Sequence, residues 1–267
     1  MLHRYFLPAL ALTVLAGLPA LAQTALKDPQ AVVLTTKAVS ALNGTTSVTD
    51  VAVQAAVTYI AGSDVETGTA TLEGHVGNQA RIVLSLSGGQ RQEVRNGPTG
   101  AWAGPDGTWY AMATHNCFAA SDWFFPVLTL QAVLADPNWN AVYVGQENFA
   151  GRPAYHIQLS HTVSGQQPGV TAIIQRLSAL DLYLDAASSL PLRIVFNTHP
   201  DDDVGLDLPV EIQFSDYKTV NGIQVPFRIQ KLIRGGLQLD LVLTSAAINS
   251  GLSSGEFTVP AITGCAQ

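Results

Sequence analysis

The strongest structural signal in the sequence is a series of tight-turn residues in its last third. Asn221-Gly222 and Gly235-Gly236 are residue pairs that tolerate the positive φ angles of a two-residue hairpin. From Leu237 to Leu243, leucines alternate with other residues, which is the pattern of a strand with one buried face. This part of the chain is therefore predicted to form antiparallel hairpins, with strands at 180–185, 192–196, 210–220, 223–231 and from 237 onward.

The first two thirds of the sequence predict further strands and two helices. A helix is expected at 28–42, with Asp28 as its N-cap and Pro29 in its first turn, and a shorter helix at 125–134. Alternating or β-rich segments predict strands at 51–59, 67–76, 81–86, 139–146 and 154–163. The order of helix, sheet, short helix and sheet indicates an α+β fold, in which one strongly curved antiparallel sheet packs on a few short helices.

The N-terminus has the pattern of a secretory signal peptide. A short basic region is followed by the apolar run 6–21 and by Ala20-Leu21-Ala22, a small-x-small cleavage signal. Pro8 and Pro19 interrupt the run, which is short for a bilayer span, so a membrane anchor is the weaker interpretation. We expect a signal peptide at 1–22, a single domain at 23–267, and a periplasmic or otherwise extracytoplasmic location.

Composition limits the partners of the protein. The chain is 47% hydrophobic and 12% charged, which allows a large core, and its net charge is −7. An acidic protein lacks the electrostatic attraction that nucleic acids and anionic membranes require. We therefore expect no nucleic-acid partner, and we expect a monomer.

The two cysteines of the chain, Cys117 and Cys265, predict a disulfide. An even number of cysteines in an exported protein favours pairing, and only one pairing is available within the chain. The alternative is two free thiols.

The sequence contains no recognised catalytic, metal-binding or cofactor motif. His199-Pro200-Asp201-Asp202-Asp203 resembles a deacetylase zinc motif, but it lies between antiparallel strands and is expected to be a solvated turn. A calcium loop formed by Asp201, Asp203 and Asp207 is a weaker alternative. We therefore predict no catalytic residues, no metal site and no cofactor.

Two histidines lie in one predicted strand. His156 and His161 are five residues apart, so they should point to opposite faces and cannot ligate one metal from that strand. His156 is expected to be exposed, and His161 to lie at a sheet edge rather than in a site.

The candidate ligand-binding residues form one segment in the middle of the chain. Trp123-Phe124-Phe125 are three successive aromatic residues, which cannot all face one core from a helix or a strand. The helix that follows carries Leu128 and Leu134 and is apolar on more than one face. These five residues are predicted to line or close an apolar cavity, whereas the alternative is a loop that plugs the core.

The C-terminal hairpins also resemble a known family. The quoted runs are Leu182-Tyr-Leu-Asp-x4-Leu-Pro-Leu-Arg193 and Phe214-Ser-Asp-Tyr-Lys-x-Val-Asn-Gly-Ile-x-Val-Pro-Phe227, followed by Phe257 and Pro260. Together they resemble the C-terminal half of the LolA-like superfamily of periplasmic lipoprotein and lipid carriers. The resemblance implies a half-open β-barrel whose helices lid a hydrophobic cavity. Arg81, Arg91 and Arg95 are all candidates for the cavity arginine of the carriers.

The residues and the resemblance together lead to one expected function. We expect an exported, non-catalytic protein that binds a lipid or an acylated protein in an apolar cavity, with a transient membrane-protein partner. The alternative is a periplasmic interaction or envelope-stress sensor module, and an extracytoplasmic hydrolase ranks third. A roomy apolar cavity favours the first function, a filled barrel with an outer apolar patch the second, and a buried His-acid-Ser cluster the third.

Overall fold

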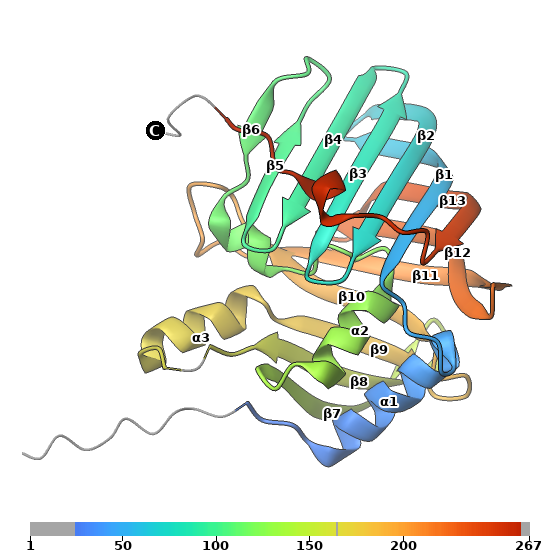
Figure 1. Cartoon of the computed structure of the whole chain (residues 1–267), viewed down its shortest axis with the longest axis vertical. Helices are drawn as coiled ribbons and strands as arrows, with labels where there is room; N and C mark the ends of the chain where they lie inside the picture. The colour runs from blue at the N-terminus through green and yellow to red at the C-terminus, as the bar shows by residue number, and fades with distance from the viewer. Residues whose placement is uncertain (1–24, 164, 263–267) are drawn as a thin grey trace, which may run out of the picture.

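The fold is an open antiparallel sheet that bends around a helical layer. The computed structural model describes residues 25–163 and 165–262, and over these residues it contains one thirteen-stranded sheet (Figure 1). The predicted signal peptide, its cleavage site and Cys265 lie outside the described residues.

The sheet consists of two runs of hairpins that meet where β1 pairs with β13. The strand order is β6-β5-β4-β3-β2-β1-β13-β12-β11-β10-β9-β8-β7, so the edges are β6 and β7. The first run contains β1 (Asp50–Ala61), β2 (Asp64–His75), β3 (Gln79–Leu86), β4 (Gly89–Asn96), β5 (Thr99–Ala103) and β6 (Trp109–Ala111). The second contains β7 (Trp139–Phe149), β8 (Arg152–His161), β9 (Leu180–Asp185), β10 (Pro191–Thr198), β11 (Leu208–Val220), β12 (Ile223–Ile233) and β13 (Gly236–Ile248).

The turn chemistry explains the C-terminal hairpins. Asn221 and Gly222 both have positive φ, at 51° and 84°, as predicted for the β11–β12 turn. In the β12–β13 turn the positive φ values belong to Arg234 and Gly235, whereas Gly236 already begins β13. The predicted strands and the α+β class are thus confirmed, with the second turn one residue earlier than expected.

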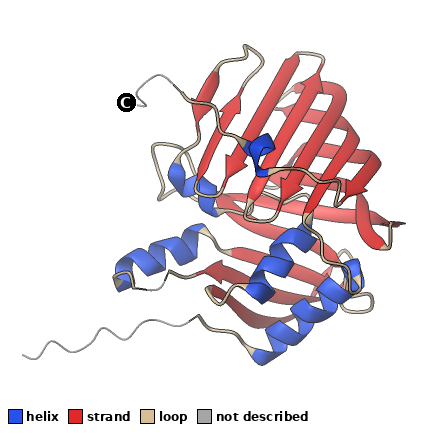
Figure 2. Ribbon diagram, in the orientation of Figure 1, coloured by secondary structure: helices blue, strands red, loops and turns tan. Residues whose placement is uncertain are grey.

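Three α-helices accompany the sheet in the described part of the chain: α1 (Pro29–Asn43), α2 (Pro126–Ala135) and α3 (Pro168–Leu177) (Figure 2). Asp28 caps α1 as predicted, because its carboxylate accepts a hydrogen bond from the Gln30 amide at 2.7 Å. The sequence analysis did not predict α3. None of the described helices is long and apolar enough to cross a membrane.

One face of the sheet forms the main core with α1 and α2. Alternate residues of the strands are buried on this face, and Leu128 of α2 lies close to Gly74, near the end of β2. Gly74 permits this close approach, since a Cβ atom there would lie 3.2 Å from Leu128 Cδ1 and 3.3 Å from Phe124 Cζ. On the other face, the C-terminal segment crosses β3, β4 and β5 and places Phe257 against Val94 and Ala101 (Figure 1). The short helix η1 (Thr114–Phe118) lies in the connection between β6 and α2, and η2 (Ser254–Phe257) lies in the C-terminal segment.

Candidate ligand-binding pocket

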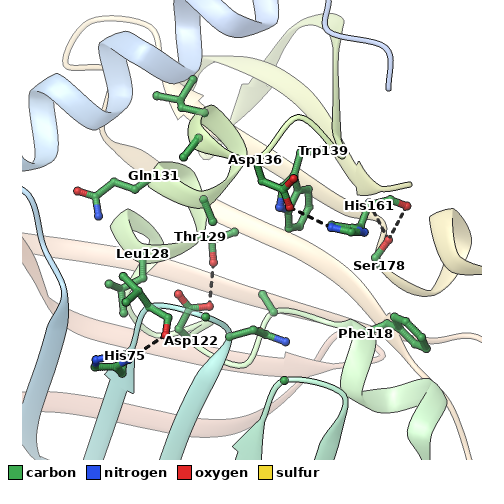
Figure 3. A pocket seen from close by; sticks show the side chains of 18 of the residues that line it. His75, Phe118, Asp122, Leu128, Thr129, Gln131, Asp136, Trp139, His161 and Ser178 are labelled. Carbon is green, nitrogen blue, oxygen red and sulfur yellow. Dashed lines mark hydrogen bonds and ion pairs between the residues drawn. The ribbon is translucent and has the colours of Figure 1, made fainter. Parts of the chain in front are cut away.

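A large pocket lies beside α2, between the turns after β2 and β4 and the neighbouring ends of β7, β8 and α3 (Figure 3). Its volume is about 900 Å³, and most of its lining surface is apolar. The walls come from the α1–β1 loop, the turns after β2 and β4, η1 and the segment after it, α2, and the neighbouring ends of β7, β8 and α3. The lining residues are Ser47, Val48, Thr49, His75, Val76, Gly77, Asn78, Gly97, Pro98, Cys117, Phe118, Ala120, Asp122, Leu128, Thr129, Gln131, Ala132, Leu134, Ala135, Asp136, Trp139, His161, Val163 and Ser178.

Helix α2 contributes one stripe to the pocket and another to the core. Leu128, Ala132 and Ala135, spaced at helical intervals, all line the pocket, as does Leu134. Val127, Leu130 and Val133 are buried in the core instead. The apolar character of this helix on several sides, which the sequence made evident, therefore has a structural reason: α2 separates the core from a hollow.

The aromatic triplet lies in the core. Trp123, Phe124 and Phe125 are each at most 2% exposed, and none of them lines the pocket. The premise that three successive rings cannot share one core was wrong here, because the residues occupy a turn rather than a helix or a strand. The Phe125 amide donates to the carbonyl of Asp122 at 2.8 Å, and the Trp123 and Phe124 rings meet edge to face at 5.7 Å. The rings therefore form a plug behind the pocket, while Leu128 and Leu134 reach its surface.

Asp122 is a buried acid in the pocket wall. Its side chain accepts a hydrogen bond from the Thr129 hydroxyl at 2.9 Å (Figure 3). Burial raises the pKa of this carboxyl to about 6, against the opposing effect of the Thr129 hydrogen bond. Sequence analysis missed Asp122, because an isolated aspartate before an aromatic cluster carries no motif.

Asp136 and His161 form a second polar group in the pocket wall. The Asp136 Oδ2 and His161 Nε2 atoms are 3.2 Å apart, and the Trp139 ring meets the imidazole edge to face at 5.5 Å. Partial burial opposes ionisation of Asp136, but hydrogen bonds from Asn138 and His161 outweigh it and lower the pKa of this carboxyl. His161 was expected at a sheet edge rather than in a site. It lines the pocket because it is the last residue of β8, and this end of the strand borders the pocket.

Ser178 lies next to His161 but does not complete a catalytic triad with it. The Ser178 hydroxyl donates to the Ile174 carbonyl at 2.7 Å and accepts from the His161 backbone amide at 2.8 Å. Its contacts are thus with backbone groups, as expected of a residue at the end of α3, and not with the imidazole ring that would have to remove its proton.

The other predicted histidine lies on the opposite face, as its spacing indicated. His156 is not exposed, however, because its two ring nitrogens lie 2.7 Å from Glu147 Oε1 and 2.8 Å from Asp181 Oδ1. The ring also stacks on Tyr183, with the two ring centres 4.4 Å apart. None of the four residues of this cluster lines the pocket.

The His199–Asp203 segment is only partly the solvated turn that was expected. Asp201, Asp202 and Asp203 are exposed, whereas His199 is 4% exposed. The Asn116 side chain donates a hydrogen bond to the His199 carbonyl and accepts one from the His199 backbone amide. His199 Nε2 lies 3.0 Å from Asp207 Oδ1. Within the described residues, no three His, Cys, Asp or Glu side chains are grouped so that they could hold a metal ion.

Cys117 is buried in the pocket wall, and burial raises the pKa of its thiol. Because Cys265 is outside the described residues, the pairing of the two cysteines stays a prediction.

The three arginines considered for a cavity role pair with glutamates instead. Arg81 pairs with Glu73, Arg91 with Glu66 and Arg95 with Glu93, and none of the three arginines lines the pocket.

Comparison with known proteins identifies the fold. No family model matches the chain, and no curated protein matches it. Among solved structures, a LolA superfamily protein from Nitrosomonas europaea is 12% identical, with a TM-score of 0.51 over 85% of this chain and 97% of that one. A domain proposed to sort outer-membrane lipoproteins, from Vibrio parahaemolyticus, is also 12% identical, with a TM-score of 0.51 over 85% and 95% of the two chains. A DUF1329 family protein from Desulfovibrio piger is 13% identical, with a TM-score of 0.50 over 86% and 96%. The resemblance predicted from the hairpins is therefore confirmed at the level of the fold.

Proposed function

We propose that this protein binds an apolar chain, that of a lipid or an acylated protein, in the pocket beside α2 and carries out no chemistry on it. The observation that carries the proposal is the pocket itself, with its volume of about 900 Å³ and its mostly apolar lining. Pockets for small molecules typically measure roughly 300–1,000 Å³ and are lined mainly by apolar groups, with a few polar groups that orient the ligand.

The binding energy would come from removing the chain from water. Each buried methylene contributes about 0.8 kcal/mol, so a segment of about eight methylenes would contribute roughly 6 kcal/mol before the costs of association. Leu128 and Leu134 on α2, with Phe118 and Trp139 on other segments, supply apolar contact surface. The aromatic plug Trp123–Phe125 supports this wall from behind, and we assign it a structural role.

The fold and the sequence agree with this proposal. The similar structures include a LolA superfamily protein and a domain proposed to sort outer-membrane lipoproteins, and the pattern at 1–22 is that of a signal peptide. Together they support a lipid-binding role in the periplasm or another extracytoplasmic compartment. The backbone contacts of Ser178 favour a non-catalytic role for the polar groups of the pocket.

Uptake of 1-N-phenylnaphthylamine, an uncharged fluorophore that brightens in apolar surroundings, tests the proposal. Ala132 lines the pocket from an exposed position on α2, so Ala132→Trp should obstruct the hollow without disturbing the core. Ser40→Trp is the matched control, since Ser40 is an exposed helical residue on α1 outside the pocket lining. We expect uptake by the wild type and by Ser40→Trp and its loss in Ala132→Trp. Equal uptake by all three would contradict the assignment of the site.

A protein-interaction module is the second candidate, and one surface favours it. Val170 and Ile173 on α3 are exposed, as are Val204 and Leu206 in the β10–β11 loop. Arg176 joins the two segments, because its guanidinium donates to the Val204 carbonyl at 3.0 Å. Absence of uptake of any apolar probe by the wild type would favour this surface over the pocket.

A further inference from the structure

The described lining of the pocket contains acidic side chains but no lysine or arginine, which limits the ligands that can bind. Its ionisable lining residues are His75, Cys117, Asp122, Asp136 and His161, and no lysine or arginine occurs among the described residues that form the lining. The pocket therefore contains two carboxyl groups and no permanently positive side chain.

Two cations that contact the backbone of pocket-lining or adjacent residues, Lys27 and Arg95, already have other partners. Lys27 donates to the Val133 and Asp136 carbonyls at 3.1 and 3.0 Å, so its ammonium group caps the end of α2. Arg95 pairs with Glu93 at 2.7 Å and donates to the Asn116 carbonyl at 3.1 Å. Each of these groups would have to break existing hydrogen bonds to neutralise an anion in the pocket.

Asp122 is placed so that its negative charge acts on a ligand in the pocket, with little screening by water. The residue is 5% exposed and belongs both to the pocket lining and to the turn before α2. The charged groups around this turn are Glu93 and Arg95 on β4 and Lys231 on β12, whose ammonium group lies 5.2 Å from the ring centre of the neighbouring Trp123. On the pocket side Asp122 faces the Thr129 hydroxyl, with which it already has a hydrogen bond.

A buried carboxylate discriminates strongly between kinds of ligand. It accepts hydrogen bonds from a hydroxyl or an ammonium group, which compensates for its own loss of water. A second negative charge nearby is instead disfavoured, because both ions would be desolvated without a cation between them.

We infer that the ligand of this pocket is an amphiphile whose polar end donates hydrogen bonds and carries no negative charge, and that Asp122 determines this selectivity. The inference rests on the proposed function, since it specifies the polar end of the chain that the pocket binds. Hydroxyl-bearing lipids such as glycerol ethers or acylglycerols fit this description, whereas lipids that end in a carboxylate or a sulfonate do not.

Two probes with the same tail test the inference. 1-Dodecylglycerol has an uncharged end with two hydroxyl donors, and dodecanesulfonate has an end that stays negative at every pH used. Calorimetric titration at pH 8, below the aggregation concentration of each probe, gives the two affinities. We expect the wild type to bind 1-dodecylglycerol at least about tenfold more tightly than dodecanesulfonate.

Variants assign the effect to Asp122. Asp122→Asn keeps the shape of the side chain and its ability to accept from Thr129, and it should reduce the preference several-fold at pH 8. Asp202→Asn makes the same chemical change at an exposed position outside the pocket lining and should keep the wild-type preference. In the wild type, the preference should also fall between pH 8 and pH 5, as the buried Asp122 carboxyl takes up a proton.

Different outcomes contradict different claims. Equal binding of both probes by the wild type at pH 8 would overturn the inference and leave the proposed function intact. An unchanged preference in Asp122→Asn would overturn the assignment to this residue. Binding of neither probe would contradict the proposed function, and the inference with it.

Discussion

The buried acid in the pocket wall should make the stability of the protein depend on pH in a specific way. Burial in the folded protein raises the pKa of the Asp122 carboxyl to about 6, from its ordinary value of 3.8. Since one pKa unit corresponds to about 1.4 kcal/mol, this difference amounts to about 3 kcal/mol. The side chain is almost completely buried, so solvent screening does little to reduce that figure.

The sign of the effect follows from the order of the two pKa values. Below about pH 4 the carboxyl is protonated in both states and has no effect on the balance between them. Between about pH 4 and pH 6 the unfolded chain loses this proton first, so the free energy of unfolding decreases. Above about pH 6 both states are ionised, and the destabilisation stays constant at about 3 kcal/mol.

Replacing Asp122 with Asn should remove this dependence. We expect the free energy of unfolding of Asp122→Asn, relative to the wild type, to increase by about 3 kcal/mol between pH 4 and pH 7. Urea unfolding followed by tryptophan fluorescence at several pH values measures it, and Asp202→Asn, which changes an exposed aspartate, is the control. A difference between Asp122→Asn and the wild type that is constant from pH 4 to pH 7 would refute this reasoning.

Two further predictions concern the plug and the cysteines. Phe124→Ala should lower the free energy of unfolding by about 3–5 kcal/mol, because the ring is 1% exposed in the core. Leu134→Ala, at the pocket surface, should lower this free energy by less. Equal decreases for the two variants in urea unfolding would argue against a structural plug. Cys117 and Cys265 should be bonded in the exported protein, which would stabilise it by about 4 kcal/mol; non-reducing peptide mapping that finds both thiols free would contradict this.

The features that the sequence predicted are those with a local physical cause. Alternation of apolar residues defines the strands, Asn221-Gly222 supplies the backbone angles of a tight hairpin, and Asp28 with Pro29 marks the start of α1. The one-residue difference at Arg234 and Gly235 shows the limit of such signals, because any of three adjacent residues could take the positive φ angles and the pairing of β12 with β13 decides between them.

The pocket could be predicted only in part, because its walls come from segments far apart in the chain. The apolar residues on more than one face of α2 predicted that this helix lines or closes a cavity, and Leu128 and Leu134 do line the hollow. Asp122 and His161 are far apart in the sequence, and both line the pocket only because the fold places the turn before α2 and the end of β8 around it. The assignment of Trp123–Phe125 to the cavity surface rested on helix and strand geometry, whereas these residues form a turn.

The lipid-binding function is tested most directly by mass spectrometry of organic extracts from protein purified under native conditions after export. We expect the wild type and Ser40→Trp to retain a lipid with an uncharged, hydroxyl-bearing end, in a stoichiometric amount. Ala132→Trp, whose new side chain obstructs the pocket, should retain none. Extracts without lipid from the wild type, or the same lipid in equal amount from all three proteins, would contradict the proposed function.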